Sequence, residues 1–276
     1  MSHRLFEDKA QVSAYKRHRV SPPETIIGAI MGFLESKQKE KPFTQALDVG
    51  CGSGQGTVML APHFLEVVGT DISPAQLEVA RAECHPANVS YRECPAEELP
   101  FPDGSADLVT SMTAAHWFDW PRFLSEACRL LKPGGCLVLL SYTMDMELRY
   151  RDCSDRLNAV CAQFYEALRP YRPAHLGPCS RLLYRDMYES VPFPDKKWCD
   201  GVQQWCSMPL SRFMGIVESF TSYQLLLKRD PRAAQALSHG FQSRLLELMA
   251  VSSPDTVVDV ATNYFYFMAC KPAAAD

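Results

Sequence analysis

The chain has 276 residues, of which 47% are hydrophobic and 22% are charged, and its net charge at pH 7 is −4. This composition is typical of a globular protein and excludes a disordered or fibrous chain. The acidic balance offers no basic face for a nucleic acid, and no stretch has the length and hydropathy of a membrane span.

The eleven cysteines do not form a metal-binding or disulfide pattern. Their number is odd, no two stand in a C-x-x-C spacing, and several lie within apolar runs such as Gly135-Cys136-Leu137. Such usage is typical of buried free thiols in a reducing compartment. Residues 1–8 also lack the apolar segment of a secretion signal. We therefore expect a cytoplasmic protein without a bound metal.

The beginning of the chain predicts a helical arm or lid, residues 1–41, in front of a main domain of residues 42–276. Pro22-Pro23-Glu24 favours a helix start, and the pattern continues to about Lys37. The apolar face of this helix is formed by Ile26, Ile27, Ile30, Met31, Phe33 and Leu34.

The next hundred residues alternate between short apolar runs and helical patterns. The predicted helices are 54–61, 74–84 and 121–131. Strands that alternate with helices indicate a parallel sheet with right-handed crossovers. The predicted strands are 44–49, 66–70, 88–92, 106–110 and 136–142.

This alternation breaks after Tyr142. Residues 145–190 contain three prolines and short helical patterns, and we interpret them as an insertion into the main domain. The chain then predicts a strand at 196–205, helices at 211–227 and 232–249, and an alternating closing strand at 257–269.

A glycine-rich loop follows the first predicted strand, with the pattern D-x-G-x-G-x-G from Asp48 to Gly54. Gly50 and Gly52 allow positive φ and let a ligand approach the backbone closely. A dinucleotide fingerprint needs G-x-G-x-x-G, and Gln55 and Thr57 break both possible registers. Asp48 is instead suited to meet the ammonium group of an amino-acid cofactor such as S-adenosylmethionine.

A second acid, Asp71, ends the next predicted strand. An acid at this position accepts hydrogen bonds from ribose hydroxyls, and Ile72 would then flank the adenine. The alternative role, a helix cap, is better suited to Ser73, which stands directly before Pro74.

Together these motifs resemble those of the class I S-adenosylmethionine-dependent methyltransferases. The resemblance covers residues 44–142 and includes the D-V-G-C-G-S-G loop, A-E-E-L-P-F at 96–101 and L-L-K-P-G-G at 130–135. It implies a doubly wound, Rossmann-like α/β fold with a seven-stranded, mostly parallel sheet and a helical insertion covering the site. Many relatives hold the adenine amino group with an Asp where this chain has Pro95. We therefore expect a backbone group near Pro95, Ala96 and Glu97 to serve instead.

A narrower resemblance is to the trans-aconitate methyltransferase-like branch. It rests on Phe6, Tyr15, Arg19 and Pro22-Pro23, and on A-A-H-W-F-D at 114–119. It implies that the arm folds over the cofactor, with Tyr15 and Arg19 near the methionine carboxylate.

Methyl transfer needs alignment and desolvation more than a metal or a covalent nucleophile. Ala114 is small enough to let the methionine portion pass. His116 is the candidate general base if the acceptor must lose a proton, and its alternative role is structural. Trp117 is a candidate wall of the substrate pocket, or else a packing residue.

For the methyl acceptor we expect a small molecule, most simply a carboxylic acid methylated on oxygen. A carboxylate is already ionised at pH 7 and needs only a cation to hold it. Arg149 is the candidate cation, and Arg181 is a weaker one. Two alternatives stay open: carbon methylation of a lipid, quinone or sterol, and an inactive cofactor-binding protein. The sequence predicts no oligomeric state.

Overall fold

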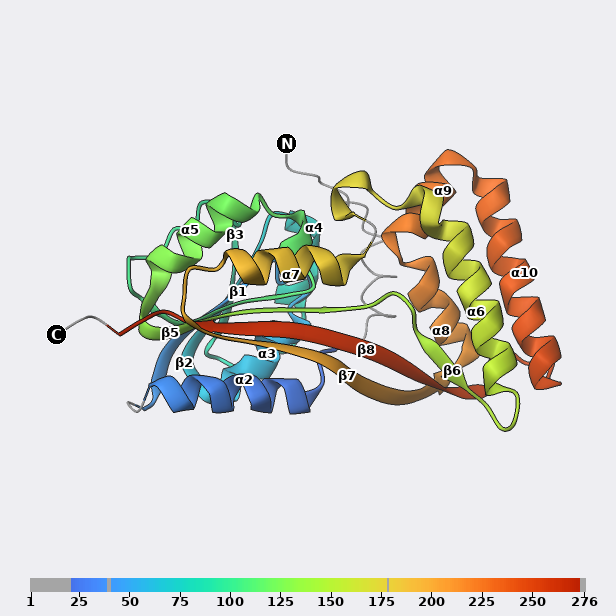
Figure 1. Cartoon of the computed structure of the whole chain (residues 1–276), viewed down its shortest axis with the longest axis horizontal. Helices are drawn as coiled ribbons and strands as arrows, with labels where there is room; N and C mark the ends of the chain where they lie inside the picture. The colour runs from blue at the N-terminus through green and yellow to red at the C-terminus, as the bar shows by residue number, and fades with distance from the viewer. Residues whose placement is uncertain (1–20, 39–40, 178, 274–276) are drawn as a thin grey trace.

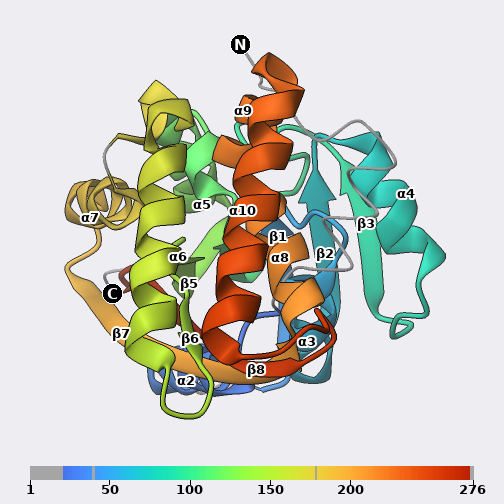
Figure 2. The same cartoon turned by 90° about the vertical axis from the view of Figure 1, so that its right-hand side faces the viewer.

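The computed structural model describes residues 21–38, 41–177 and 179–273, and its centre is one mixed sheet of eight strands. The path is β3-β2-β1-β4-β5-β8-β6, and β7 pairs with the other edge of β8 (Figures 1 and 2). Within the described residues, β8 alone runs against the other strands. The bounds are β1 Phe43–Val49, β2 Phe64–Asp71, β3 Val89–Glu93, β4 Ala106–Met112, β5 Leu131–Tyr142, β6 Glu147–Arg149, β7 Asp195–Pro209 and β8 Val257–Cys270.

The predicted doubly wound α/β fold is confirmed, with two differences in the strands. The short strand β6 was not predicted, because three residues give no usable periodicity. The fifth strand begins at Leu131 rather than at residue 136. Residues 132–135 loop out as an irregularity between β4 and β5, and Gly134 has a φ of 78° there.

The two faces of the sheet bury alternate residues of the same strands. Leu137, Leu139, Phe265 and Phe267 point to the face covered by α5 (Trp120–Leu130) and α7 (Ser180–Ser190). Val138, Leu140, Tyr264, Tyr266 and Met268 point to the face covered by α2 (Glu24–Lys37) and α3 (Gln55–Leu60). Helix α4 (Pro74–Ala82) contacts β2 and β3. Side chains of a strand alternate in this way because its period is two.

Helix α2 is part of the sheet's packing rather than a cover over a site. Ile30 and Leu34 are fully buried against the sheet, in one cluster with Val138 and Leu140. The expected arm therefore divides: its helix joins the core, whereas residues 1–20, including Tyr15 and Arg19, lie outside the described residues.

A helical cap stands at one end of the sheet. It contains α6 (Ser154–Leu168), α8 (Leu210–Glu218), α9 (Thr221–Arg229) and α10 (Pro231–Met249), which share one apolar cluster (Figure 2). Strands β6, β7 and β8 extend from the sheet beneath these helices (Figure 1). Of the segment 145–190, α6 belongs to the cap, whereas α7 packs on the sheet. Two short 3-10 turns, η3 (Arg169–Tyr171) and η4 (Ala174–Leu176), connect them.

The predicted helix 211–227 is interrupted in the structure. Helix α8 ends at Glu218, α9 begins at Thr221, and Phe220 between them has an extended ψ of 138°. The break turns residues 219–222 toward the sheet end of the cap, where they line the cavity described below.

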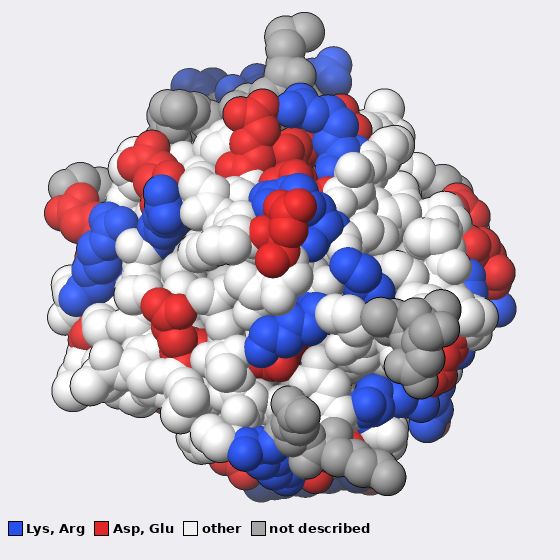
Figure 3. All heavy atoms as spheres, turned by 90° about the vertical axis from the view of Figure 1, so that its left-hand side faces the viewer, with Lys and Arg blue, Asp and Glu red and all other residues white. Residues whose placement is uncertain are grey.

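The face of the molecule away from the cap carries acidic and basic side chains interspersed over a largely uncharged surface (Figure 3). None of the helices in the described part of the chain is both long and apolar enough to cross a membrane.

The packing of α2 makes a direct prediction about stability. Leu34→Ala should lower the free energy of unfolding by about 2–5 kcal/mol, because it leaves a cavity in the core. Glu35→Ala, on the exposed side of the same helix, removes only a surface ion pair with Lys41 and should cost less than about 1 kcal/mol. Urea unfolding of both variants tests this. Equal, small effects would mean that α2 is a peripheral arm.

Candidate active site at the carboxyl edge of the sheet

The loop after β1 takes the conformation that its glycines were predicted to allow. Gly50, Gly52 and Gly54 have φ values of 69°, 55° and 82°. A Cβ on Gly50 would lie 2.4 Å from the Ala114 Cβ, and a Cβ on Gly54 would lie 2.2 Å from the Tyr91 hydroxyl. A side chain at Gly50 or Gly54 would displace Ala114 or Tyr91, because the loop packs closely against the ends of the neighbouring strands.

Asp48 lies buried beneath this loop, and only one of its two carboxylate oxygens has a hydrogen-bond partner among the described residues. One carboxylate oxygen accepts a hydrogen bond from the Thr57 hydroxyl at 2.6 Å, and the other has no hydrogen-bond partner among the described residues. Burial raises the pKa of Asp48 to about 7, although the Thr57 bond acts in the opposite direction. A buried acid in this state is poised to receive a cation.

Asp71 ties the glycine loop to the loop after β2. One of its oxygens accepts from the Gly52 N–H at 2.8 Å, and the other accepts from the Ser73 N–H at 2.8 Å. Burial raises the pKa of Asp71 despite these bonds. Ser73 is the cap of α4, as predicted, because its hydroxyl accepts from the Gln76 N–H. Ile72 is half-buried beside the acid.

The segment after β3 lies against the same edge. The Cys94 N–H donates to the Asp71 carbonyl at 3.2 Å, and Ala96 is buried. Glu97 accepts from the Asp119 N–H at 2.8 Å, so its carboxylate braces the start of α5. Pro95 offers no side-chain polar group, which leaves backbone groups for any contact with a base.

These residues fit the cofactor that the motif implies. The unpartnered oxygen of Asp48 lacks the positive partner that the ammonium of S-adenosylmethionine would supply. At Gly52 an added Cβ would meet nothing closer than the Gln76 side chain at 3.7 Å, so the backbone there is open to a ligand. Asp71, at the carboxyl end of a neighbouring strand, occupies the position that suits ribose hydroxyls.

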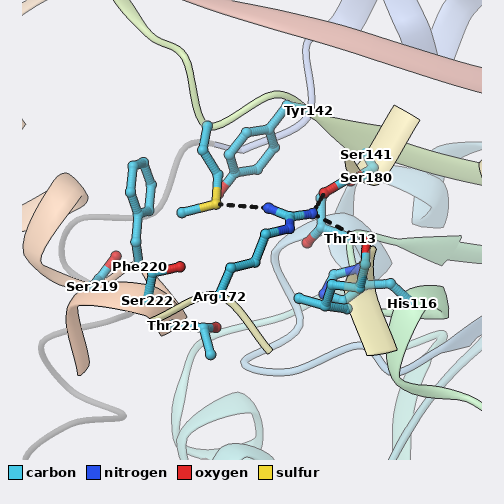
Figure 4. A pocket seen from close by; sticks show the side chains of 12 residues that line it. Thr113, His116, Ser141, Tyr142, Arg172, Ser180, Ser219, Phe220, Thr221 and Ser222 are labelled. Atoms are coloured by element: carbon cyan, nitrogen blue, oxygen red, sulfur yellow. Dashed lines mark hydrogen bonds between the residues drawn. The ribbon is translucent and has the colours of Figure 1, made fainter. Parts of the chain in front are cut away.

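A cavity that opens to solvent lies between this sheet edge and the cap (Figure 4). The sheet edge contributes residues that follow β4 and β5, and the cap contributes the α8–α9 junction and the turns before α7. Its lining consists of Thr113, His116, Ser141, Tyr142, Met144, Arg172, Leu176, Ser180, Ser219, Phe220, Thr221 and Ser222.

Thr113 begins the turn from β4 into the cavity with strained backbone geometry. Its φ is 76°, a value that β-branched residues rarely adopt, and its N–H donates to the Leu140 carbonyl at 2.7 Å. Strain of this kind persists where the surrounding structure enforces it, often at functional sites. The short 3-10 turn η2 (Ala115–Trp117) follows Thr113 and places His116 at the cavity.

The two aromatic candidates after β4 have different positions. His116 lines the cavity, and its Nδ1 lies 3.3 Å from the Tyr184 hydroxyl. Trp117 is not among the lining residues. Its ring packs against His116 at 5.2 Å and against His175 at 4.9 Å. Trp117 thus supports the wall from behind, which is the packing role left open by the sequence.

Arg149, the expected cation of the substrate site, is not at the cavity. It is exposed on β6, and its guanidinium stacks on the Trp205 ring at 4.1 Å. Arg181 pairs with Asp200 at 3.4 Å. The arginine that lines the cavity is Arg172. It was missed because it lies in a proline-rich stretch without periodicity, Arg169-Pro170-Tyr171-Arg172-Pro173.

Known proteins with a similar sequence match the segment that contains the glycine loop. Residues 47–139 match the family described as a methyltransferase domain. The chain is 39% identical over 138 residues to an uncharacterized methyltransferase of Mycobacterium tuberculosis, covering 50% of this chain and 52% of that protein. It is 38% identical over 109 residues to trans-aconitate 2-methyltransferase of Deinococcus radiodurans, covering 38% and 41%.

Similarity in three dimensions extends further. A structure of a candidate type II methyltransferase from Anaeromyxobacter dehalogenans aligns with a TM-score of 0.74 and 22% identity, covering 92% of this chain and 99% of that one. Residues 47–139 are thus a methyltransferase domain, and the fold of the chain is that of the Anaeromyxobacter structure. The chain spans about half the length of the curated relatives that it matches. The cap lies outside the matched segment 47–139.

The buried charge of Asp48 predicts opposite effects on stability and on binding. The folded pKa, about 7, exceeds the ordinary 3.8, so ionisation destabilises the ligand-free fold increasingly between these pH values. Asp48→Asn keeps an acceptor for Thr57 and removes the charge. At pH 8 the variant should therefore unfold at a higher temperature than the wild type, and near pH 4 the two should coincide. Its affinity for S-adenosylmethionine should fall by about 1.5–3 kcal/mol.

Asp107→Asn provides the matched control. Burial raises the pKa of Asp107, but bonds from Lys132, Gln45 and Thr44 outweigh it, and the net pKa is lowered. This variant should be less stable than the wild type at pH 8 and should bind the cofactor normally. Scanning calorimetry and titration calorimetry measure both quantities. A destabilised Asp48→Asn at pH 8 would contradict the account of its buried charge.

Proposed function

We propose that the chain transfers a methyl group from S-adenosylmethionine to a small carboxylic acid bound in the cavity, forming a methyl ester. The observation that carries the proposal is the Arg172 guanidinium, which faces the cavity without a carboxylate partner (Figure 4). The Deinococcus relative, which is named for an acidic substrate, supports the same direction.

Arg172 is held in place by neutral groups. Its Nε donates to the Gly177 carbonyl at 2.7 Å, and one terminal nitrogen donates to the Ser180 hydroxyl at 3.0 Å. Within the described residues, no carboxylate lies within ion-pair distance of it. By contrast, the surface arginines Arg122 and Arg129 each pair with an acid. Burial lowers the pKa of Arg172, and the nearby Cys179 and Asp145 offset this effect only in part. An anionic ligand would supply the remaining compensation.

The rest of the lining also favours a polar, anionic acceptor. Hydroxyl groups reach the cavity from Thr113, Ser141, Ser180, Ser219, Thr221 and Ser222. The beginning of α9 lies there too, with the positive end of its dipole, and no side chain caps it. Carbon methylation of a lipid or quinone would call for a predominantly apolar groove. Tyr142, Met144, Leu176 and Phe220 give the lining an apolar part, so that reaction stays the alternative. Asp48 and Asp71, both intact, speak against an inactive protein.

A carboxylate suits this set of side chains chemically. The bound cofactor supplies an electrophilic methyl group on a positively charged sulfur. An acceptor oxygen forms the new O–C bond while the C–S bond breaks, and the electron pair of that bond stays on sulfur. Because the acceptor is ionised at pH 7, no proton has to be removed. Arg172 would bind and orient the acid, and the cap would exclude water from the reacting atoms.

Truncation of the arginine tests the proposal. Arg172→Leu should raise KM for a di- or tricarboxylate by about 10- to 100-fold, the equivalent of losing hydrogen bonds to a charged group. The dissociation constant of the cofactor should not change, because Arg172 belongs to the cap. Arg149→Leu, outside the cavity, is the control and should behave as the wild type. The same KM in both variants would remove Arg172 from acceptor binding.

The product gives an independent test. With radiolabelled cofactor and a pool of small acids, the transferred methyl should be released as methanol by mild alkali, since esters hydrolyse there. If the label instead survives alkali and the preferred acceptors are neutral thiols or lipids, the proposal of a carboxylate acceptor is wrong.

A further inference from the structure

We propose that Cys136 and Cys270 form a reversible modification site, in which a peroxide converts the two thiols into a disulfide that links β5 to β8. All eleven cysteines of the chain are free thiols in the structure. Neither Cys136 nor Cys270 lines the cavity, so the proposal does not depend on the identity of the methyl acceptor.

The backbone spacing at this position suits a disulfide. Cys136 and Cys270 are directly opposite each other in the antiparallel pair of β5 and β8. The neighbouring Lys271 N–H donates to the Gly135 carbonyl at 2.9 Å. Because hydrogen-bonded pairs alternate along antiparallel strands, the two cysteines form a non-hydrogen-bonded pair. The Cα atoms of such a pair are about 4.5 Å apart, within the range of about 4.4–6.8 Å that disulfides span.

The two sulfur atoms also point toward each other. Both side chains lie on the face of the sheet that α2 covers, and their thiols are hydrogen-bonded to one another. Each Sγ lies close to the Gly134 carbonyl oxygen as well, at 3.9 Å for Cys136 and 3.4 Å for Cys270. Because the backbone spacing and the direction of the side chains both suit a disulfide, the strands need not move for it to close.

The end of α2 places a cation beside this pair. Lys37, the last residue of the helix, forms an ion pair with Asp195 of β7 at 2.6 Å. The hydrogen bond with Cys136 lowers the pKa of Cys270, and the Lys37 ammonium acts in the same direction, against burial and the Asp195 carboxylate. Cys270 is therefore the thiol that ionises more readily and attacks an oxidant first.

The position of Cys270 in the sheet also gives it the better access to a small oxidant. It is the last residue of β8 and keeps 6% of its exposure, whereas Cys136 is fully buried. The ends of a strand open more readily than its centre, so local opening exposes Cys270 first. By contrast, Cys199 on the other side of β8 is opposite Tyr266, so its partner in register is not a thiol.

Oxidation by a peroxide proceeds in two balanced steps. The Cys270 thiolate attacks one peroxide oxygen, so that an S–O bond forms, the O–O bond breaks and hydroxide leaves. The Cys136 thiolate then attacks the sulfur of this sulfenic acid, so that the S–S bond forms, the S–O bond breaks and a second hydroxide leaves. Each hydroxide takes up the proton that a thiol has lost. Two thiols and one hydrogen peroxide thus give one disulfide and two water molecules.

The disulfide would close the cap-bearing part of the chain into a loop. Helices α6, α8, α9 and α10 and strand β7 all lie between Cys136 and Cys270 in the sequence. A cross-link between the ends of this segment restricts its unfolded and partly opened states, and this restriction stabilises the folded state. Oxidation would therefore keep the cap docked at the carboxyl edge of the sheet.

Peptide mapping of the full chain tests the proposal. The wild-type protein is treated with hydrogen peroxide, quenched with catalase, alkylated in denaturant and digested without reduction. Mass spectrometry should find two peptides linked through Cys136 and Cys270, and dithiothreitol should separate them. If Cys136 and Cys270 are recovered as alkylated thiols while the exposed Cys84 and Cys206 are oxidised, the proposal is wrong.

Thermal unfolding measures the effect on the fold. Oxidation should raise the unfolding midpoint of the wild type by about 4–10 °C, and dithiothreitol should reverse this shift. Cys84→Ser, at an exposed position, is the control and should show the same shift, whereas Cys270→Ala should show none. A shift that persists in Cys270→Ala, or one that is lost in Cys84→Ser, would assign the stabilisation to another cysteine and overturn the proposal.

Discussion

The pairing of β8 with three other strands is the constraint on which the architecture depends. Its last residues pair with β5, three residues of its first half (Asp259–Ala261) pair with β6, and β7 follows nearly its whole length. Because β7 and β8 continue beyond the sheet, they carry the cap helices to the carboxyl ends of the parallel strands (Figure 1). Without this extension, the segments that follow β4 and β5 would lack the cap residues that complete the cavity.

Electrostatics divides the site into two halves. On the sheet side, Asp48 and Asp71 are buried acids with raised pKa values, suited to the ammonium and the ribose of the cofactor. On the cap side, Arg172 lines the cavity and donates hydrogen bonds to the Gly177 carbonyl and the Ser180 hydroxyl. Each charge destabilises its own surroundings until its ligand is bound, a cost that functional sites commonly carry.

The grouping of the proposed cofactor residues at one sheet edge could be predicted from the sequence because it is local. Asp48, Gly50 and Gly52 are consecutive positions of one strand–loop–helix unit, and Asp71 ends the next strand, so strand order alone brings them together. The acceptor half could not, because Arg172 and residues 219–222 come from segments that only the β8 extension joins. The extended backbone at Phe220, inside an otherwise continuous helical pattern, also has no clear sequence signal. The position of Arg149 after β5 made it a candidate for binding the acceptor, but its guanidinium stacks on Trp205 outside the cavity.

The central claim is that the cavity recognises an anion. The most direct measurement is titration calorimetry of the protein saturated with S-adenosylhomocysteine, using a tricarboxylate and its neutral triamide of the same shape. The account predicts saturable binding of the tricarboxylate, weakened by rising salt, and no measurable binding of the triamide. Equal affinity for the two compounds would contradict it.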